Sequence, residues 1–360
     1  MSGTPQASTA TMPRPPTGRP AGPALAPPRP PGLNGEAFAG ARASPLLKRL
    51  QAAIGESVIG YDDAVLALTI ALSCDGHVLL EGLPGLAKTY LVRSFARALD
   101  LTYRRIQFTP DMLPLDIIGN VVLNPKSQEF EFRPGPVFSN ILLADEINRA
   151  PPKVQSALLE AMQEFQVTVD GRSYPLPRPF LVIATQNPVD LQGTYPLPES
   201  QLDRFMFRHV LDYPSRENEV RILATQERDL GHEVAPRIVS QEEIAALRAR
   251  HQDTFVHPEL LAYIADVVRE TRKEPRVLMG ASPRAAVHLM LAARALAFLD
   301  DRRYVLPDDV RAAAFHVLNH RLVLSPESKR IRPTEGSGTS AVLLLQDVIE
   351  SIVNRVPTPR

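Results

Sequence analysis

The chain has 360 residues, of which 44% are hydrophobic, so it can bury a large core and is long enough for about two domains. Its 40 basic and 40 acidic residues cancel, so the net charge provides no long-range attraction to nucleic acid or to an anionic membrane. The single cysteine, Cys74, excludes an intramolecular disulfide and a cysteine-built metal site. No apolar run approaches the roughly 18 residues that a bilayer requires. We therefore expect a cytoplasmic protein without membrane insertion.

Residues 1–43 form a proline-rich segment that contains ten prolines, four arginines and one acidic residue. Such a composition buries too little apolar surface to offset the entropy lost on ordering, so we expect a disordered tail with polyproline-like stretches. Recognition of this tail by a proline-binding domain is the alternative. After it, apolar residues recur at helical spacing over 44–54 and 61–73, which predicts two helices.

A glycine-rich turn between a strand and a helix is the most informative stretch of the chain. The apolar run 77–80 leads into Glu81–Tyr90, and a helix-like segment over 91–99 follows. In such a turn the backbone N–H groups favour an anion, Lys88 adds a point charge, and the hydroxyl of Thr89 can ligate Mg²⁺. This arrangement suggests a nucleoside triphosphate as the ligand, with an ordinary turn before a helix as the alternative.

The stretch departs from the phosphate-loop pattern G-x-x-x-x-G-K-[ST] at one position, because Ala87 replaces the last glycine. We expect alanine to allow the helical backbone needed there. Val58, Ile59 and Gly60, which precede the loop, are interpreted as an apolar seat for adenine, with a helix-to-helix turn as the alternative. The residues predicted to surround the nucleotide are Val58, Ile59, Gly60, Gly82, Leu83, Pro84, Gly85, Leu86, Ala87, Lys88, Thr89 and Tyr90.

Two acidic residues end a second apolar run. Residues 141–146 read as a buried parallel strand that delivers Asp145 and Glu146 to its carboxyl-terminal edge, where α/β sheets bind ligands. Asp145 can hold Mg²⁺ and Glu146 can polarise an attacking water. An acidic helix cap is the alternative. Upstream of this run, the pattern predicts a strand over 103–109, a short helix over 110–119 and a hairpin over 121–132.

Further elements complete the α/β part. A helix is predicted over 152–164, a hairpin over 166–174, a buried strand over 180–185 that ends before Asn187, and a closing strand over 207–213. Asn187 can sense a phosphate or orient water, although Asn187–Pro188 also suits a turn.

From residue 216 onward the pattern is wholly helical, with a last helix over 341–354. His316 and His320, at i and i+4, resemble half of a zinc site, but a plain helix face is the favoured interpretation because the glutamate of H-E-x-x-H is absent. We expect a tail over 1–43, a nucleotide-binding core over 44–214, a helical domain over 215–335, and a linker with a C-terminal helix over 336–360.

Seven motifs, in this order, resemble those of the MoxR-type AAA+ ATPases, and the resemblance covers residues 44 to about 325. They are Glu81–Thr89, Leu142–Ala150, Leu158–Glu164, Ala184–Pro188, Gly193–Glu199, Leu202–Phe205 and Gly280–Ala285. The resemblance implies an α/β P-loop NTPase fold with a three-layer αβα core and parallel sheet, followed by an all-α lid domain. Alanine before the lysine is usual in this family.

The resemblance also implies roles for individual residues. Lys88 would contact the β- and γ-phosphates of ATP, and Thr89 and Asp145 would hold Mg²⁺. Glu146 would prepare the water and Asn187 would be the first sensor. By the same resemblance, Arg204 would be an arginine finger that reaches a neighbouring subunit, and Arg284 the second sensor. The hairpins would face the pore of a homo-oligomeric, hexameric ring.

Three functions compete. The first is an ATP-hydrolysing, chaperone-like remodeller that assembles, activates or loads metal into a client complex, often with a von Willebrand factor type A domain protein. The second is a helicase- or chelatase-like motor, but the hairpin sets Lys126 against Glu129 and Glu131, so we expect no nucleic-acid partner. The third is a non-hydrolysing scaffold, which would be expected to lack Glu146 or Arg204.

Overall fold

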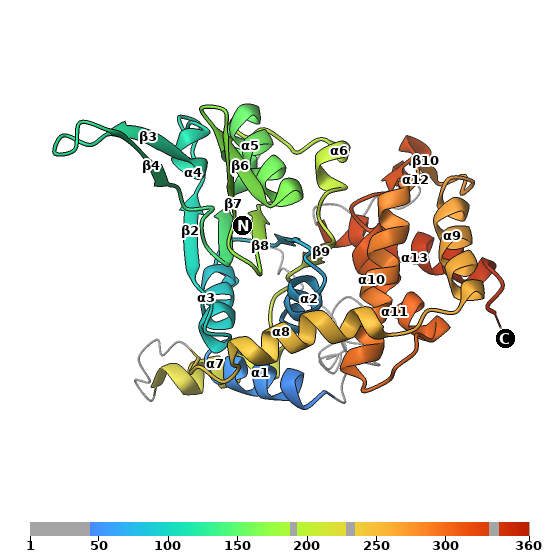
Figure 1. The fold of residues 1–360 in the computed structure, drawn as a ribbon. Coiled ribbons are helices and arrows are strands. Elements are labelled where there is room, and N and C mark those ends of the chain that lie inside the picture. The colour runs from blue at the N-terminus through green and yellow to red at the C-terminus, as the bar shows by residue number, and fades with distance from the viewer. Residues whose placement is uncertain (1–43, 188–192, 228–234, 331–337, 360) are drawn as a thin grey trace, which may run out of the picture. The chain divides into compact units, whose positions relative to one another are not determined.

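The computed structural model describes residues 44–187, 193–227, 235–330 and 338–359 (Figure 1). The predicted disordered tail over 1–43 lies outside these residues, as does Pro188. Among the described helices, none is long and apolar enough to cross a bilayer.

Five parallel strands form the central sheet, in the order β2-β5-β8-β1-β9. The strands are β1 (Val78–Glu81), β2 (Tyr103–Gln107), β5 (Ile141–Asp145), β8 (Leu181–Gln186) and β9 (Phe207–Val210). Because all five run in the same direction, their carboxyl ends meet at one edge. The segments that follow β1, β5 and β8 are therefore neighbours in space.

Both faces of this sheet are buried, which explains the continuous apolar runs in the sequence. Val78 and Leu80 of β1 belong to one hydrophobic cluster, whereas Leu79 belongs to a second. In β5, Leu143 joins the first cluster and Leu142 the second. This alternation follows from the period of two residues in a strand.

Helices cover the two faces and give three layers (Figure 1). The first cluster contains side chains of α1 (Pro45–Gly55), α2 (Asp62–Ser73) and α3 (Lys88–Ala98), and the second contains side chains of α4 (Leu115–Ile118) and α5 (Pro152–Glu164). The bounds of α1, α2, α3 and α5 lie within three residues of the predicted ones, whereas α4 is shorter than the helix predicted over 110–119.

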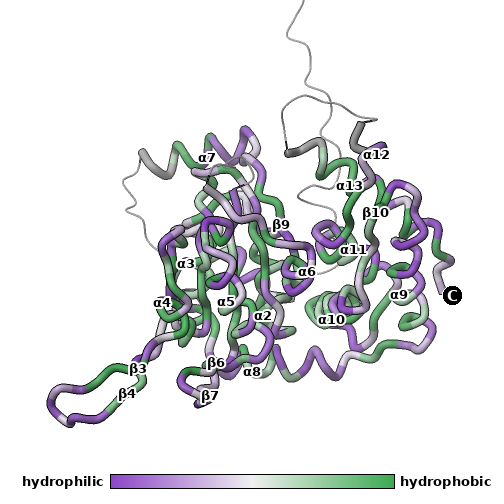
Figure 2. Tube along the Cα trace, turned by 90° about the horizontal axis from the view of Figure 1, so that it is seen from above, coloured by the Kyte–Doolittle hydropathy of each residue, from purple (hydrophilic) through white to green (hydrophobic). Residues whose placement is uncertain are grey.

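Two β-hairpins are inserted in the α/β part, as predicted. The first pairs β3 (Gly119–Leu123) with β4 (Phe130–Pro134), and the second pairs β6 (Gln166–Val169) with β7 (Arg172–Pro175). The rings of Phe132 and Tyr174 stack at 4.0 Å between centroids, which joins the two hairpins. The β3–β4 hairpin extends away from the sheet (Figures 1 and 2), and 75% of Phe130 is exposed near its end.

The remaining chain is mostly helical. Its helices are α6 (Glu199–Leu202), α7 (Arg216–Glu227), α8 (Gln241–Arg250), α9 (Pro258–Thr271), α10 (Pro283–Leu299), α11 (Pro307–Leu318), α12 (Pro326–Arg330) and α13 (Gly338–Arg355). A 3-10 turn, His251–Asp253, follows α8, and another, Ile147–Arg149, follows β5 in the α/β part. The expectation of a wholly helical pattern from residue 216 is wrong in one place, because β10 (Val277–Met279) pairs antiparallel with β11 (Val323–Leu324). Strands of three and two residues are too short to show an alternating pattern, and their pairing depends on contacts distant in sequence.

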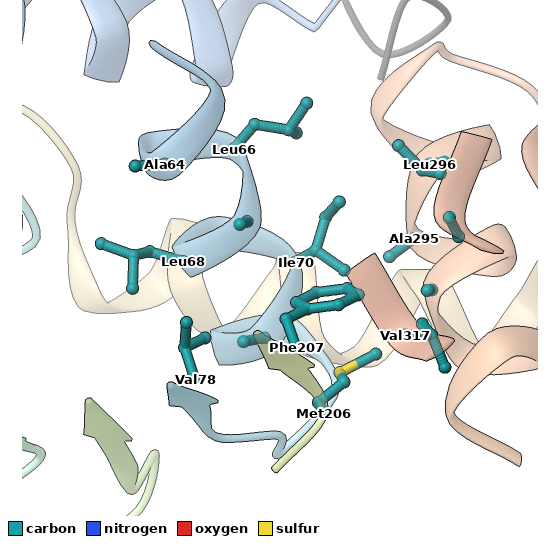
Figure 3. Close-up of a cluster of buried hydrophobic side chains, with 14 of the residues drawn as sticks. Ala64, Leu66, Leu68, Ile70, Val78, Met206, Phe207, Ala295, Leu296 and Val317 are labelled. Atoms are coloured by element: carbon teal, nitrogen blue, oxygen red, sulfur yellow. The ribbon is translucent and has the colours of Figure 1, made fainter. Parts of the chain in front are cut away.

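The first hydrophobic cluster continues from the sheet into the later helices (Figure 3). Phe207 of β9 and Ile70 of α2 share it with Ala295 of α10 and Val317 of α11. Burial of these side chains stabilises the contact between the sheet and the C-terminal helices.

The two histidines that stand at i and i+4, His316 and His320, lie in this junction. His316 is buried and its ring stacks on that of His209 at 5.4 Å, and His320 is buried with Nε2 at 3.1 Å from the carbonyl oxygen of Phe205. His316 lies on α11, whereas His320 lies beyond its end at Leu318, and both are buried because β9 and the residues before it pack here. Across the described ranges, no group of three or more His, Cys, Asp or Glu side chains could hold a metal ion.

The buried histidines make the fold sensitive to acid. Burial lowers the pKa of His209 to about 4, below its ordinary value of 6.5. The unfolded chain therefore binds more protons than the folded chain between pH 6.5 and about 4, so the free energy of unfolding falls as the pH drops through this window. We predict that His209→Gln makes this fall shallower by up to about 1.4 kcal/mol per pH unit, measured by urea unfolding between pH 7.5 and 4.5. His257→Gln, at a ring that is 58% exposed, is the control; equal slopes for the parent and His209→Gln would contradict the prediction.

Candidate functional site

The glycine-rich loop connects β1 to α3 at the carboxyl edge of the sheet. Gly85 has a φ of +87°, which favours glycine, and a Cβ at Gly82 would lie 3.1 Å from the carbonyl oxygen of Leu211. Leu86 is buried in the first cluster and anchors the loop, whereas Pro84 is exposed. The buried side chain of Leu86 therefore attaches the loop to the first cluster, while Pro84 and Gly85 are exposed.

Ala87 adopts a left-handed backbone, with φ of 51° and ψ of 24°, and α3 begins directly after it. The expectation that alanine serves there in a helical conformation is wrong. A left-handed alanine costs roughly 1–2 kcal/mol, a penalty that glycine would not incur. Ala87 has no side-chain oxygen to cap α3, and an uncapped helix N-terminus offers backbone donors to an anion.

Lys88 folds back over the loop. Its Nζ donates to the carbonyl oxygens of Gly82 at 2.6 Å and Leu83 at 3.3 Å. Burial lowers the pKa of Lys88, and nearby carboxylates oppose that shift. These carboxylates belong to Asp145, Glu146 and Glu81, so the lysine lies within the electrostatic reach of the acids at the end of β5.

Asp145 is buried and both of its carboxylate oxygens have donors. Arg105 of β2 donates to Oδ2 from Nη2 at 2.7 Å and from Nε at 3.1 Å. The hydroxyl of Thr185 in β8 donates to Oδ1 at 2.6 Å. The aspartate therefore bridges the two strands that flank β5.

Glu146 also has a left-handed backbone, with φ of 59°. Its backbone N–H donates to the hydroxyl of Thr185 at 2.8 Å, and its Oε2 accepts from Nε2 of Gln107 at 2.9 Å and Nε of Arg149 at 2.8 Å. Non-glycine residues in this conformation are enriched at functional sites, where surrounding contacts hold them. Here those contacts come from three separate elements.

Sequence reasoning missed four residues of this network. Arg105 and Gln107 lie two residues apart on β2 and so share a face, and register pairs Gln107 with Asp145. Polar residues at that spacing, followed by the end of a strand, are the signal that could have found them. Thr185 ends an apolar run, and Arg149 stands three residues after Glu146.

The proposed sensors and finger lie at different places. Asn187 directly follows β8, beside the end of β1, because register pairs Glu81 with Gln186. Arg204 lines a cavity of about 220 Å³ whose other walls include Glu160 and Glu164 of α5.

Arg284, on the first turn of α10, donates from Nη1 to Asp203 Oδ2 at 3.3 Å. The contacts of Arg204 and Arg284 in the described chain are thus separate from those of Lys88, Asp145 and Glu146.

The proposed adenine seat divides into two parts. Val58 is buried in the first hydrophobic cluster, while Ile59 and Gly60 line a cavity of about 270 Å³ with Arg221. Gly60 has a φ of +90°, and a Cβ there would lie 2.6 Å from Nδ2 of Asn218. Leu83 and Tyr90 are half-buried against the same cluster.

Two family models match the chain. The model described as the ATPase family associated with various cellular activities (AAA) matches residues 77–207, which hold the loop and both acids. The model described as the AAA lid domain matches residues 269–337. Together with the parallel five-stranded sheet, these matches confirm the predicted α/β P-loop NTPase fold with a helical lid.

Curated relatives and a solved structure match over most of the chain. Chaperone MoxR1 of Mycobacterium tuberculosis is 47% identical over 277 residues, covering 74% of this chain and 73% of that protein. The uncharacterized protein YeaC of Bacillus subtilis is 43% identical over 316 residues, covering 88% and 96%, and protein MoxR of Methylorubrum extorquens is 31% identical over 335 residues, covering 86% and 94%.

A crystal structure from Cytophaga hutchinsonii, designated a candidate ATPase, has a TM-score of 0.77 and 40% identity, and the match covers 90% of this chain and 97% of that one. The chain therefore belongs to the MoxR family of AAA+ ATPases.

Proposed function

We propose that this protein binds ATP and Mg²⁺ and hydrolyses ATP in a hexameric ring to remodel, assemble or activate a client protein complex. The observation that carries the proposal is that Lys88 follows the loop after β1, and Asp145 and Glu146 stand at the end of β5, so that all three lie at the carboxyl edge of the same parallel sheet. A cation beside a phosphate-binding loop and two acids on a nearby strand end are the groups that phosphoryl transfer requires.

Binding of the triphosphate would exchange the partners of Lys88. Its ammonium now satisfies two loop carbonyls and would turn to the β- and γ-phosphates, joined by backbone N–H groups at the start of α3. Ile59 and Gly60 would take the adenine at the cavity that they line, with Val58 supporting them from the core. Gly82, Leu83, Pro84, Gly85, Leu86, Ala87 and Tyr90 would complete the loop around the phosphates.

Thr89 and Asp145 would hold Mg²⁺. A hydroxyl and a carboxylate oxygen suit this cation, and Asp145 offers Oδ2, which a guanidinium now occupies. When bound, the cation neutralises charge on the phosphates. Arg105 would then share or release Oδ2, since one oxygen cannot serve both at full strength.

Glu146 would orient and deprotonate the attacking water. Gln107 and Arg149 hold its Oε2 in the arrangement described above, so the carboxylate would change partners before it meets water. Asn187, at the end of the neighbouring strand, would orient the same water or the γ-phosphate. Arg284 would contact the phosphates as a second sensor.

Arg204 would act on the nucleotide of the adjacent subunit. Its guanidinium has no ion-pair or hydrogen-bond partner in the described ranges, and it lies in a cavity beside α5. A head-to-tail contact at this cavity would close into a ring when the rotation permits.

The hairpins would face the ring pore and contact the client. Phe130 is exposed near the end of the first hairpin, and Glu129 and Glu131 flank it. This apolar and acidic surface suits a protein client better than nucleic acid. The chaperone name of the mycobacterial relative supports a client role, and we propose a von Willebrand factor type A domain protein as partner, in the cytoplasm.

Lys88→Ala should abolish tight nucleotide binding. Hydrogen bonds to charged groups are worth about 1.5–3 kcal/mol, so we expect the Kd for ATP to rise roughly 10- to 150-fold in isothermal titration calorimetry. Lys48→Ala, at an exposed residue of α1, is the matched control. Unchanged ATP affinity in a folded Lys88→Ala protein would remove the phosphate-loop assignment.

Glu146→Gln should bind ATP but hydrolyse it about 10²- to 10⁴-fold more slowly, because only the water-activating carboxylate is lost. Phosphate release under saturating ATP measures the rate, and Glu350→Gln, at an exposed residue of α13, is the control. If Glu146→Gln turned over ATP at the parent rate, another group would have to activate the water.

Arg204→Ala should bind ATP and yet lose about 10³-fold or more in turnover. Mixed with Lys88→Ala, whose own site binds ATP weakly but whose Arg204 is intact, it should regain activity at interfaces that pair an intact nucleotide site with an intact Arg204. The measurement is ATPase rate against mixing ratio, with assembly followed by light scattering. Co-assembled mixtures that never exceed the sum of the two variants would exclude action across an interface.

A further inference from the structure

Thr185 is a buried polar residue near the carboxyl end of β8, and the proposed mechanism assigns it no role. It is only 1% exposed. The regular pairing of β5 with β8 ends one residue before it, at Ala144 and Ala184. Thr185 therefore stands beside the point where β5 leaves the sheet and delivers Asp145 and Glu146.

The hydroxyl of Thr185 connects these two acids. It donates to Oδ1 of Asp145 at 2.6 Å, and it accepts the backbone N–H of Glu146 at 2.8 Å. Chemistry fixes these directions, because a backbone amide can only donate and the hydroxyl has one proton to give. One hydroxyl thus holds the side chain of the first acid and the backbone of the second.

The two carboxylate oxygens of Asp145 have partners of different kinds. Arg105, on Oδ2, has a side chain that is 45% exposed, so a cation from solvent can reach this oxygen and replace the guanidinium. Thr185, on Oδ1, is buried and uncharged, so no such exchange is open to it. When Oδ2 changes partner, the contact at Oδ1 therefore keeps the carboxylate in its orientation.

The second contact of Thr185 holds the turn at Glu146. The backbone of Glu146 is left-handed, with φ of 59° and ψ of 52°, and a non-glycine residue keeps this conformation only where surrounding contacts hold it. The acceptor of its N–H is the Thr185 side chain, so the turn is held from β8. Because φ and ψ limit the side-chain rotamers, this backbone also limits where the Glu146 carboxylate can reach.

From these contacts we propose that Thr185 is a positioning residue for both acids. It orients the carboxylate of Asp145 for a cation at Oδ2, and it sets the backbone from which Glu146 reaches the attacking water. The inference rests on the proposed roles of Asp145 in holding Mg²⁺ and of Glu146 in preparing water, and it adds the residue that couples them. Replacing a group that orients a metal ligand commonly weakens metal binding about 10- to 100-fold.

The metal half is tested by binding, without turnover. In the Glu146→Gln background, titration calorimetry gives the Kd for ATP in Mg²⁺ and in EDTA, and the ratio of the two is the gain in affinity that the cation provides. Thr185→Val keeps the shape of the side chain but removes the hydroxyl. It should reduce this ratio about 10-fold, while the Kd in EDTA stays unchanged. Thr185→Ser, which restores the hydroxyl, should return the ratio toward the parent value.

Thr69→Val is the matched control. Thr69 of α2 is also a buried threonine, and its hydroxyl donates to the carbonyl oxygen of Val65 at 2.7 Å, so its loss should lower stability without changing the ratio. If Thr185→Val does not fold, Thr185→Cys, whose thiol is a weaker donor, should shift the ratio in the same direction. A folded Thr185→Val or Thr185→Cys protein with the parent ratio would overturn the metal half. No effect of Mg²⁺ on the parent would refute the proposed Mg²⁺ site, and the inference with it.

The water half is tested by turnover in chains that keep Glu146. At saturating ATP and Mg²⁺ the metal half no longer limits the rate, so Thr185→Val should still lower kcat, by about 10- to 100-fold, and Thr185→Ser should restore it. Because both changes act through one carboxylate, Thr185→Val/Glu146→Gln should be no slower than Glu146→Gln alone. A loss that saturating Mg²⁺ removes completely, or a further loss in the double variant, would overturn the link to Glu146.

Discussion

The parallel register of β5 between β2 and β8 is the constraint on which the rest of the site depends. Register pairs Gln107 of β2 with Asp145 on one side of β5, and β8 with Thr185 lies on the other side. Asp145 therefore receives hydrogen bonds from both neighbouring strands, from Arg105 and from Thr185. A shift of one residue would turn every side chain of β5 to the opposite face and exchange the two hydrophobic clusters. The apolar residues that bury both faces therefore also fix the two acids at the edge.

Nearly every charged side chain of the site already has a partner within the described part of the chain. Lys88 donates to loop carbonyl oxygens. Asp145 forms an ion pair with Arg105, Glu146 with Arg149, and Asp203 with Arg284. Ligand binding on such a surface exchanges contacts rather than adding them, so the net affinity is a difference between two sets of interactions.

The sequence predicted the elements whose signal is local. The strand, glycine-rich turn and lysine of the loop, and the apolar run that ends in Asp145 and Glu146, are contiguous patterns. The partners of these residues were not predicted, because Arg105 and Thr185 are single polar residues on other strands and only strand order brings them together. The backbone of Ala87 was mispredicted because side-chain identity alone does not specify a left-handed φ.

The most direct test of the central claim is a structure of the full chain carrying Glu146→Gln, determined with ATP and Mg²⁺. We predict phosphates on the glycine-rich loop beside Lys88, the cation on Thr89 and Asp145, Arg105 displaced from Oδ2, and Arg204 of an adjacent subunit at the γ-phosphate. Nucleotide bound elsewhere, or bound at the loop of a monomer with Asp145 still paired to Arg105, would contradict the account.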